Sequence, residues 1–183
     1  GQELAAKLLA RNESTKYQII QESGGVEGTV AGGVKSAQEL SAQFVPAHSE
    51  VPTLRVGIDV AREISFTDEL VKVLQEAGFE TVISNSDSSS AQSFSNLARE
   101  KCHLIISFPD FLQPASGFPL IPVINVAGRS PLHQAIRADF DCDEESLLAS
   151  VVDLIRSVAA GSQTVAEKNK SGEIRAPRSV RSV

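Results

Sequence analysis

Five polar residues stand at or after the ends of short apolar runs in this chain. They are Asp59, Asp110, Asn125, His133 and Asp139. Carboxylates and amides are oxygen ligands for Mg²⁺, an Asp can accept a phosphoryl group, and an imidazole can transfer protons near neutral pH. If the apolar runs are parallel strands of one sheet, their carboxyl ends open onto a single crevice. We therefore expect these five side chains to line one candidate crevice.

The other reactive residues follow no catalytic or metal-binding spacing. Cys102 and Cys142 lie too far apart for a zinc motif, and the three histidines are scattered. The glycines at 24, 25 and 28 follow no predicted strand and precede no Lys-Ser/Thr pair, so a phosphate loop is not indicated. The acids between 139 and 145 could hold a divalent cation, but a solvated helix start is the favoured interpretation. We expect no catalytic residue, no metal and no cofactor.

The apolar runs alternate with helical patterns, which predicts an α/β fold. Buried strands are expected at 54–60, 79–84, 103–108 and 121–126, with a brief fifth strand near 138–140. Strand-helix alternation implies right-handed crossovers and a parallel sheet covered on both faces. Five strands in about 106 residues fit the flavodoxin-like order 2-1-3-4-5.

Helices are expected between and after these strands. Apolar residues repeat at helical spacing over 66–77, where Gly78 would end the helix, and over 91–98. A short helix is expected at 130–136 and a strong one at 147–158, with Asp141 and Asp143 capping its start.

The segment between the third and fourth strands, 109–120, holds three prolines and is predicted to lack a helix. Its apolar residues Phe111, Leu112 and Phe118, with Leu120, would either cover the exposed flank of the sheet or form a docking patch for a partner. Covering is the favoured interpretation.

Charge divides the chain into three parts. Residues 53–158 carry 15 acidic and 8 basic residues, net -7, and are expected to form the folded domain. Residues 1–52 are predicted to be a flexible linker with short helical stretches, and residues 159–183, net +3, a disordered linker. The acidic balance argues against nucleic acid, and no apolar run approaches the roughly 18 residues that span a bilayer. The absence of Met indicates a module cut from a longer protein.

The order LRVGIDV, GFETVIS, HLIISF, IPVINVAG and DFDCDEESLLASVVDLIRSV resembles the receiver domain of bacterial two-component signalling. That family uses two acids after strand one, a phospho-accepting Asp after strand three, then a Thr or Ser and a Lys. Here Asp59 matches the first acid and Val60 replaces the second. Phe108 stands in the acceptor position, Ala127 in the Thr/Ser position, and Phe140 or Asp139 in the Lys position. Asp110, two residues further on, is the weak candidate for an acceptor.

The resemblance therefore implies a pseudo-receiver without phosphotransfer chemistry, like the receiver-like inserts of hybrid sensor histidine kinases. Its role in the phosphorelay would be protein–protein interaction: the partners implied are neighbouring kinase or receiver domains of the same chain, or another signalling protein. The fragment itself would be cytoplasmic, make no membrane contact and have no enzyme activity. The parent would be a histidine kinase that a membrane segment could anchor.

A second resemblance keeps a different function open. The stretch from GFETVIS to IPVINV is similar to one lobe of periplasmic or LacI-type sugar-binding proteins. In that setting Asn85 and Asp87 would bind a small polar ligand. Against it, that fold needs two lobes and roughly twice this length.

Overall fold

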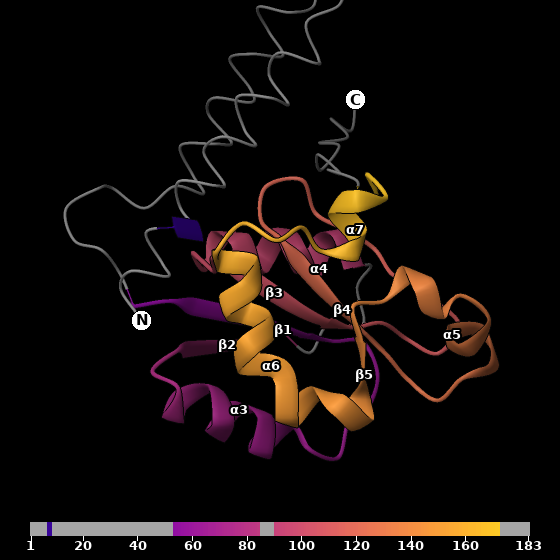
Figure 1. Ribbon diagram of the computed structural model, residues 1–183, viewed down its shortest axis with the longest axis horizontal. Coiled ribbons are helices and arrows are strands. Elements are labelled where there is room, and N and C mark those ends of the chain that lie inside the picture. The colour runs from indigo at the N-terminus through magenta and orange to yellow at the C-terminus, as the bar shows by residue number, and fades with distance from the viewer. Residues whose placement is uncertain (1–6, 9–52, 85–89, 173–183) are drawn as a thin grey trace, which may run out of the picture.

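The computed structural model describes residues 7–8, 53–84 and 90–172 of the chain (Figure 1). Within these residues a single parallel sheet has the order β2-β1-β3-β4-β5, in a flavodoxin-like α/β arrangement. The strands are β1 (Arg55–Val60), β2 (Glu80–Ser84), β3 (Leu104–Phe108), β4 (Val123–Ala127) and β5 (Cys142–Asp143). The predicted fold class and strand order are confirmed.

Burial along each strand follows its place in the sheet. Every residue of β3 (LIISF) and β4 (VINVA) is buried, because both strands lie inside the sheet and are covered on both faces. β2 lies at one edge and is half-exposed over most of its length. The neighbouring strands are in register, with Asp59 of β1 opposite Ser84 on one side and Ser107 on the other. This register brings the carboxyl ends of β1, β2 and β3 to the same edge.

Two apolar clusters hold helices on the two faces of the sheet (Figure 1). α3 (Thr67–Glu76) and α6 (Glu144–Ala159) lie together on one face and bury their apolar stripes against β1, β3 and β4. α4 (Ser90–Arg99) lies on the other face, where it packs against β1 and β2. Gly78 follows α3 with φ +82°, the left-handed conformation predicted for it as the residue that ends this helix.

Residues 109–122, all of which the structure describes, contain no helix. Phe118 instead folds back onto the sheet, is 5% exposed, and meets Phe94 of α4 edge to face with the ring centroids 6.2 Å apart. Ile121 is buried in the same cluster. The side chain of Phe118 therefore covers the sheet and cannot belong to a docking patch.

The fifth strand is shorter and later than the predicted 138–140. Residues 137–139 form a 3₁₀ turn, η1 (Arg137–Asp139), after the short helix α5 (Pro131–Ala135). Pairing with β4 begins where the N–H of Asp141 donates to the C=O of Asn125, at 3.0 Å, and continues at Cys142. The prediction was wrong because a two-residue strand leaves no periodic pattern to recognise.

The folded part of the chain also extends beyond the predicted boundary at 158. Residues Val165–Lys168 form α7, which lies against β4 (Figure 1). The hydroxyl of Thr164 accepts the N–H of Glu167, and the carboxylate of Glu167 accepts the N–H of Thr164, which makes a capping box. Ala166 is buried. The prediction of a disordered linker from 159 is thus corrected for residues 159–172; residues 173–183 lie outside the described residues.

Of the predicted N-terminal linker, only Lys7 and Leu8 are among the described residues. Both are helical, within the short helical stretch expected near the start of the chain. Leu8 is fully buried and belongs to the apolar cluster under α3 and α6. No helix among the described residues is long and apolar enough to cross a membrane.

Candidate functional site

The five residues predicted to line a crevice do not converge on one open site. Asp59 and Asn125 are buried inside the sheet, and His133 is buried beneath the loop that follows β3. Asp110 lies half-exposed in that loop. Asp139 lies in η1, where its carboxylate accepts a hydrogen bond from Asn169 at 3.2 Å.

Asp59 is enclosed near the end of β1. Its carboxylate accepts hydrogen bonds from the hydroxyls of Ser93 on α4 and Ser107 on β3, the latter at 2.9 Å. Burial raises the pKa of Asp59, while both hydroxyl hydrogen bonds act in the opposite direction. Because the side chain is only 2% exposed, this carboxylate links β1 to α4 and β3 and is not accessible to a substrate.

Phe108 fills the position at the end of β3. The ring is fully buried and meets Phe66 edge to face, with the centroids 6.0 Å apart. The side chain belongs to the apolar cluster under α3 and α6. An aromatic ring at this position offers no oxygen to a phosphoryl group or a metal ion.

Arg62 closes the crevice beside Phe108, and sequence reasoning missed its role. Its guanidinium lies 5.5 Å from the ring centroid of Phe108 and 5.3 Å from that of Phe111, so two aromatic rings enclose it. It donates to the C=O of Pro109 at 2.8 Å and to the carboxylate of Glu144. Burial lowers the pKa of Arg62, and the neighbouring Glu144 carboxylate opposes that shift.

Gly128 supplies the remaining wall around Arg62. A Cβ at this position would come within 2.8 Å of the Phe111 ring and 3.0 Å of Nε and Nη2 of Arg62. Arg62 Nε, which has no hydrogen-bond partner among the described residues, is therefore packed against the glycine backbone. That space cannot admit a ligand atom.

His133 fixes the loop after β3 and is committed to the backbone. Its Nδ1 accepts the N–H of Gly128 at 2.9 Å, which assigns the proton of the neutral ring to Nε2. Nε2 lies 3.1 Å from the C=O of Asp110 and 3.0 Å from that of Gln113, and donates to them. The ring also packs on Phe140, with the centroids 4.7 Å apart. The buried His133 side chain thus holds the loop after β3 against Gly128, and it is not accessible as a general base.

Asp110 and Asn125 hold the two ends of the same loop. The Asp110 carboxylate accepts the N–H of Leu112 at 3.0 Å, which forms a local turn at the start of the loop. The Asn125 side chain donates to the C=O of Ser116 at 3.0 Å and accepts its N–H at 3.2 Å. With both ends held, Phe111 is 44% exposed and Leu112 is 85% exposed.

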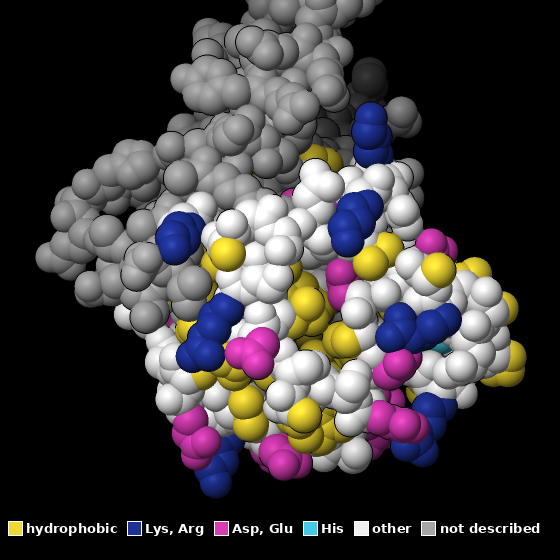
Figure 2. All heavy atoms as spheres, in the orientation of Figure 1, with side chains coloured by type: hydrophobic (Ala, Val, Ile, Leu, Met, Phe, Trp, Pro, Cys, Tyr) yellow, Lys and Arg dark blue, Asp and Glu magenta, His cyan; other side chains and the backbone are white. Residues whose placement is uncertain are grey.

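Three consecutive acids at the start of α6 each bind a different arginine. Asp143 pairs with Arg137, at 2.9 Å for Nη2 and Oδ2. Glu144 pairs with Arg62, and Glu145 with Arg129 at 2.9 Å. Figure 2 shows acidic and basic side chains side by side over α5 and β5. We refer to these as the three α6 ion pairs.

The three α6 ion pairs leave a polar cavity of about 360 Å³ at the ends of β4 and β5. Its lining includes Gly128, Gln134 and both partners of the Arg129 and Arg137 pairs. In the part of the chain described here, no group of three or more His, Cys, Asp or Glu side chains could hold a metal ion. The acids of the 139–145 run instead contact arginines, backbone N–H groups and, for Asp139, the side-chain amide of Asn169.

The two residues predicted to cap α6, Asp141 and Asp143, make other contacts instead. Asp143 occupies the position before the helix, but its side chain caps no N–H among the described residues and binds Arg137. The Asp141 carboxylate accepts the N–H of Asn125 and that of Val165, each at 2.8 Å. Asp141 therefore ties α7 to β4, and burial raises its pKa.

Asn85 and Asp87, the candidate ligand residues of the sugar-binding alternative, lie outside the described residues. The signal that could have revealed Arg62 is a basic residue two positions after β1, in a chain with a run of acids at the start of its last long helix. No family model, no curated protein and no solved structure matches this chain in the comparisons made.

Proposed function

We propose that residues 53–172 form a non-catalytic, receiver-like interaction module of a two-component signalling protein. The observation that carries the proposal is the blocked end of β3. Phe108 is fully buried where a receiver has its acceptor, and Arg62 and Glu144 form a charge pair beside it. A phosphoryl group would have neither an acceptor oxygen nor room beside the ring.

Asp110 supports the same proposal. Its carboxylate accepts a hydrogen bond from the N–H of Leu112, and its backbone C=O accepts one from His133 Nε2. Moving Asp110 towards the end of β3 would break both hydrogen bonds and release the loop. The module would act through the surface that this loop presents, with Phe111 and Leu112 at its tip.

Treatment with Mg²⁺ and acetyl phosphate, and separately with beryllofluoride, tests the loss of chemistry. We expect no phosphoryl adduct by intact mass spectrometry and no change in the amide NMR spectrum. An intact receiver domain treated in parallel verifies the reagents. An adduct on the wild-type chain that disappears in Asp110→Asn would overturn the proposal.

Binding experiments test the interaction role. The full chain would be titrated by calorimetry against the kinase and receiver domains encoded in the same gene. We expect Leu112→Asp to weaken binding at least about tenfold, since a charge replaces an exposed apolar contact. The matched control is Gln113→Asp, which places the same charge on the neighbouring exposed residue. A gene without such domains, or equal binding by both variants, contradicts the proposal.

A further inference from the structure

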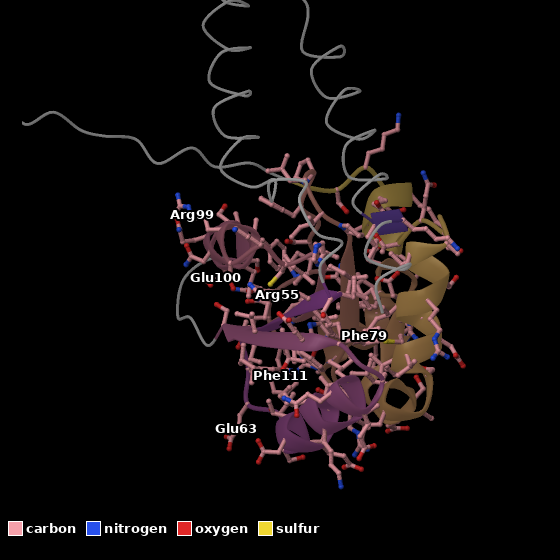
Figure 3. All side chains as sticks on the ribbon, turned by 90° about the vertical axis from the view of Figure 1, so that its left-hand side faces the viewer. Arg55, Glu63, Phe79, Arg99, Glu100 and Phe111 are labelled. Atoms are coloured by element: carbon pink, nitrogen blue, oxygen red, sulfur yellow. The ribbon has the colours of Figure 1, made fainter. Side chains whose placement is uncertain are left out.

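β2 lies at one edge of the sheet, next to β1 (Figure 3). The N–H of Glu80 donates to the C=O of Leu54, at 2.9 Å, so Glu80 faces β1. In a parallel strand the N–H and C=O of one residue point to the same side, and successive residues alternate. The N–H and C=O of Thr81 and Ile83 therefore point away from the sheet, and within the described residues they have no partner.

Among the described residues, this edge lacks most of the features that usually prevent strand pairing. Natural edge strands are protected by Lys, Pro, bulges or a covering element. Between its ends β2 consists of Thr81, Val82 and Ile83, all β-branched, and Ile83 is 43% exposed. The charge at its start, Glu80, is held by Arg55 of β1 at 2.7 Å.

We propose that β2 pairs antiparallel with β2 of a second copy of this chain, about a two-fold axis at Val82. Thr81 would then lie opposite Ile83 of the second copy, and the two residues would exchange both N–H···O bonds. Ile83 and Thr81 of the second copy form the equivalent pair. The outward-facing N–H and C=O groups of Thr81 and Ile83 are then all hydrogen-bonded in both copies. The two sheets would join into one of ten strands.

The sequence of β2 is complementary to itself in this arrangement. Thr81 and Ile83 are two residues apart and share a face, so each exposed Ile83 is covered by a threonine methyl. The axis places Glu80 opposite Ser84 of the second copy, and the two carboxylates lie at opposite ends of the pair. Like charges therefore do not face each other. These properties favour a second copy over an unrelated strand.

A single pair of five-residue strands buries less surface than a standard stable interface. We therefore expect a weak dimer that forms with increasing concentration. Pairing at β2 leaves the loop tip at Phe111 and Leu112 untouched, so this dimer forms whether or not the proposed signalling function is correct.

Sedimentation equilibrium of the full chain, from about 10 µM to about 1 mM, tests the dimer. We expect the average mass to rise towards that of two chains. Ile83→Lys, which places a charged side chain on the pairing edge, should raise the dissociation constant at least about tenfold. Gln134→Lys is the control, because it puts the same charge on an exposed residue of α5 and should dimerise like the wild type. Circular dichroism verifies that both variants fold.

Amide hydrogen exchange identifies the surface directly. The N–H groups of Thr81 and Ile83 should exchange more slowly as concentration rises, whereas that of Val82, which faces β1, should be protected throughout. A chain that stays monomeric over the whole range overturns the proposal, as does a dimer that Ile83→Lys leaves intact. A monomer that binds an unrelated extended peptide along β2 also overturns it.

Discussion

Gly128 is the residue whose missing side chain lets Arg62 and Phe111 close the carboxyl edge of the sheet. Its Cβ would lie 2.8 Å from the Phe111 ring, closer than real contacts allow. We expect Gly128→Ala to push the ring outwards and lower the free energy of unfolding by about 1–3 kcal/mol. Urea unfolding measures the change.

The control for this substitution is Gln134→Ala, at an exposed position on the same cavity. It should change the free energy of unfolding by less than about 0.5 kcal/mol. If Gly128→Ala is as stable as the wild type, Phe111 is free to move and does not hold Arg62.

Asp59 makes stability depend on pH through its burial. Because burial raises its pKa above the ordinary 3.8, the folded protein keeps this proton at pH values where the unfolded chain has lost it. Its stabilising contribution is therefore full below 3.8 and is lost as the pH rises through the folded-state pKa. Asp59→Asn removes this titration, and we expect a flatter dependence of the free energy of unfolding on pH in that window.

Unfolding by urea at a series of pH values measures this difference. Asp141, whose pKa burial also raises, keeps titrating in the variant, so the slope should diminish and not vanish. The exposed substitution Gln75→Ala, which removes no titrating group, should leave the wild-type slope unchanged. A slope in Asp59→Asn equal to that of the wild type would show that Asp59 titrates normally in the folded state.

At the scale of elements, α7 is a short helix that depends on the Thr164 capping box and on the Asp141 carboxylate, which accepts the N–H of Val165. Four residues are too few to form a stable helix alone, so its packing on β4 and the Thr164 capping box must hold it. We expect Thr164→Ala to cost about 1 kcal/mol and to speed amide exchange within α7 more than within the sheet. Gln163→Ala, one residue earlier and exposed, is the control. Equal exchange in both variants would show that the capping box does not hold α7.

The elements that sequence patterns predicted are those whose burial is visible locally. β3 and β4 are continuous apolar runs, and α3 and α6 repeat apolar residues at helical spacing, so four strands and these helices could be predicted. β5 and α7 could not, because a two-residue strand and a four-residue helix owe their existence to contacts with β4. Covering was the interpretation favoured for the apolar residues of 109–120 as a group; Phe118 is buried against the sheet, whereas Phe111 is 44% and Leu112 85% exposed.

At the scale of the whole molecule, the contacts that define the site join residues far apart in the sequence. Arg62 and Glu144 are separated by 82 positions, and Asp59 and Ser107 by 48. No local sequence pattern predicts a contact between residues so far apart. The five strand-end residues were therefore predicted to line an open crevice, whereas these contacts fill that space. The acids at the start of α6 illustrate the same point. Read locally they suggest a solvated helix end or a cation site, whereas in the fold each meets an arginine.

Leu8 extends this reasoning to the boundaries of the fold. It lies 45 positions before the predicted domain yet is fully buried in the apolar cluster under α3 and α6. Truncating a buried leucine removes its transfer free energy and leaves a cavity, so we expect Leu8→Ala to cost about 2–5 kcal/mol. Lys7→Ala, at the neighbouring exposed residue, should cost much less. Urea unfolding of the full chain compares the two, and a fragment that begins at residue 53 should be destabilised at least as much as Leu8→Ala. A fragment as stable as the full chain would show that the core is complete without Leu8.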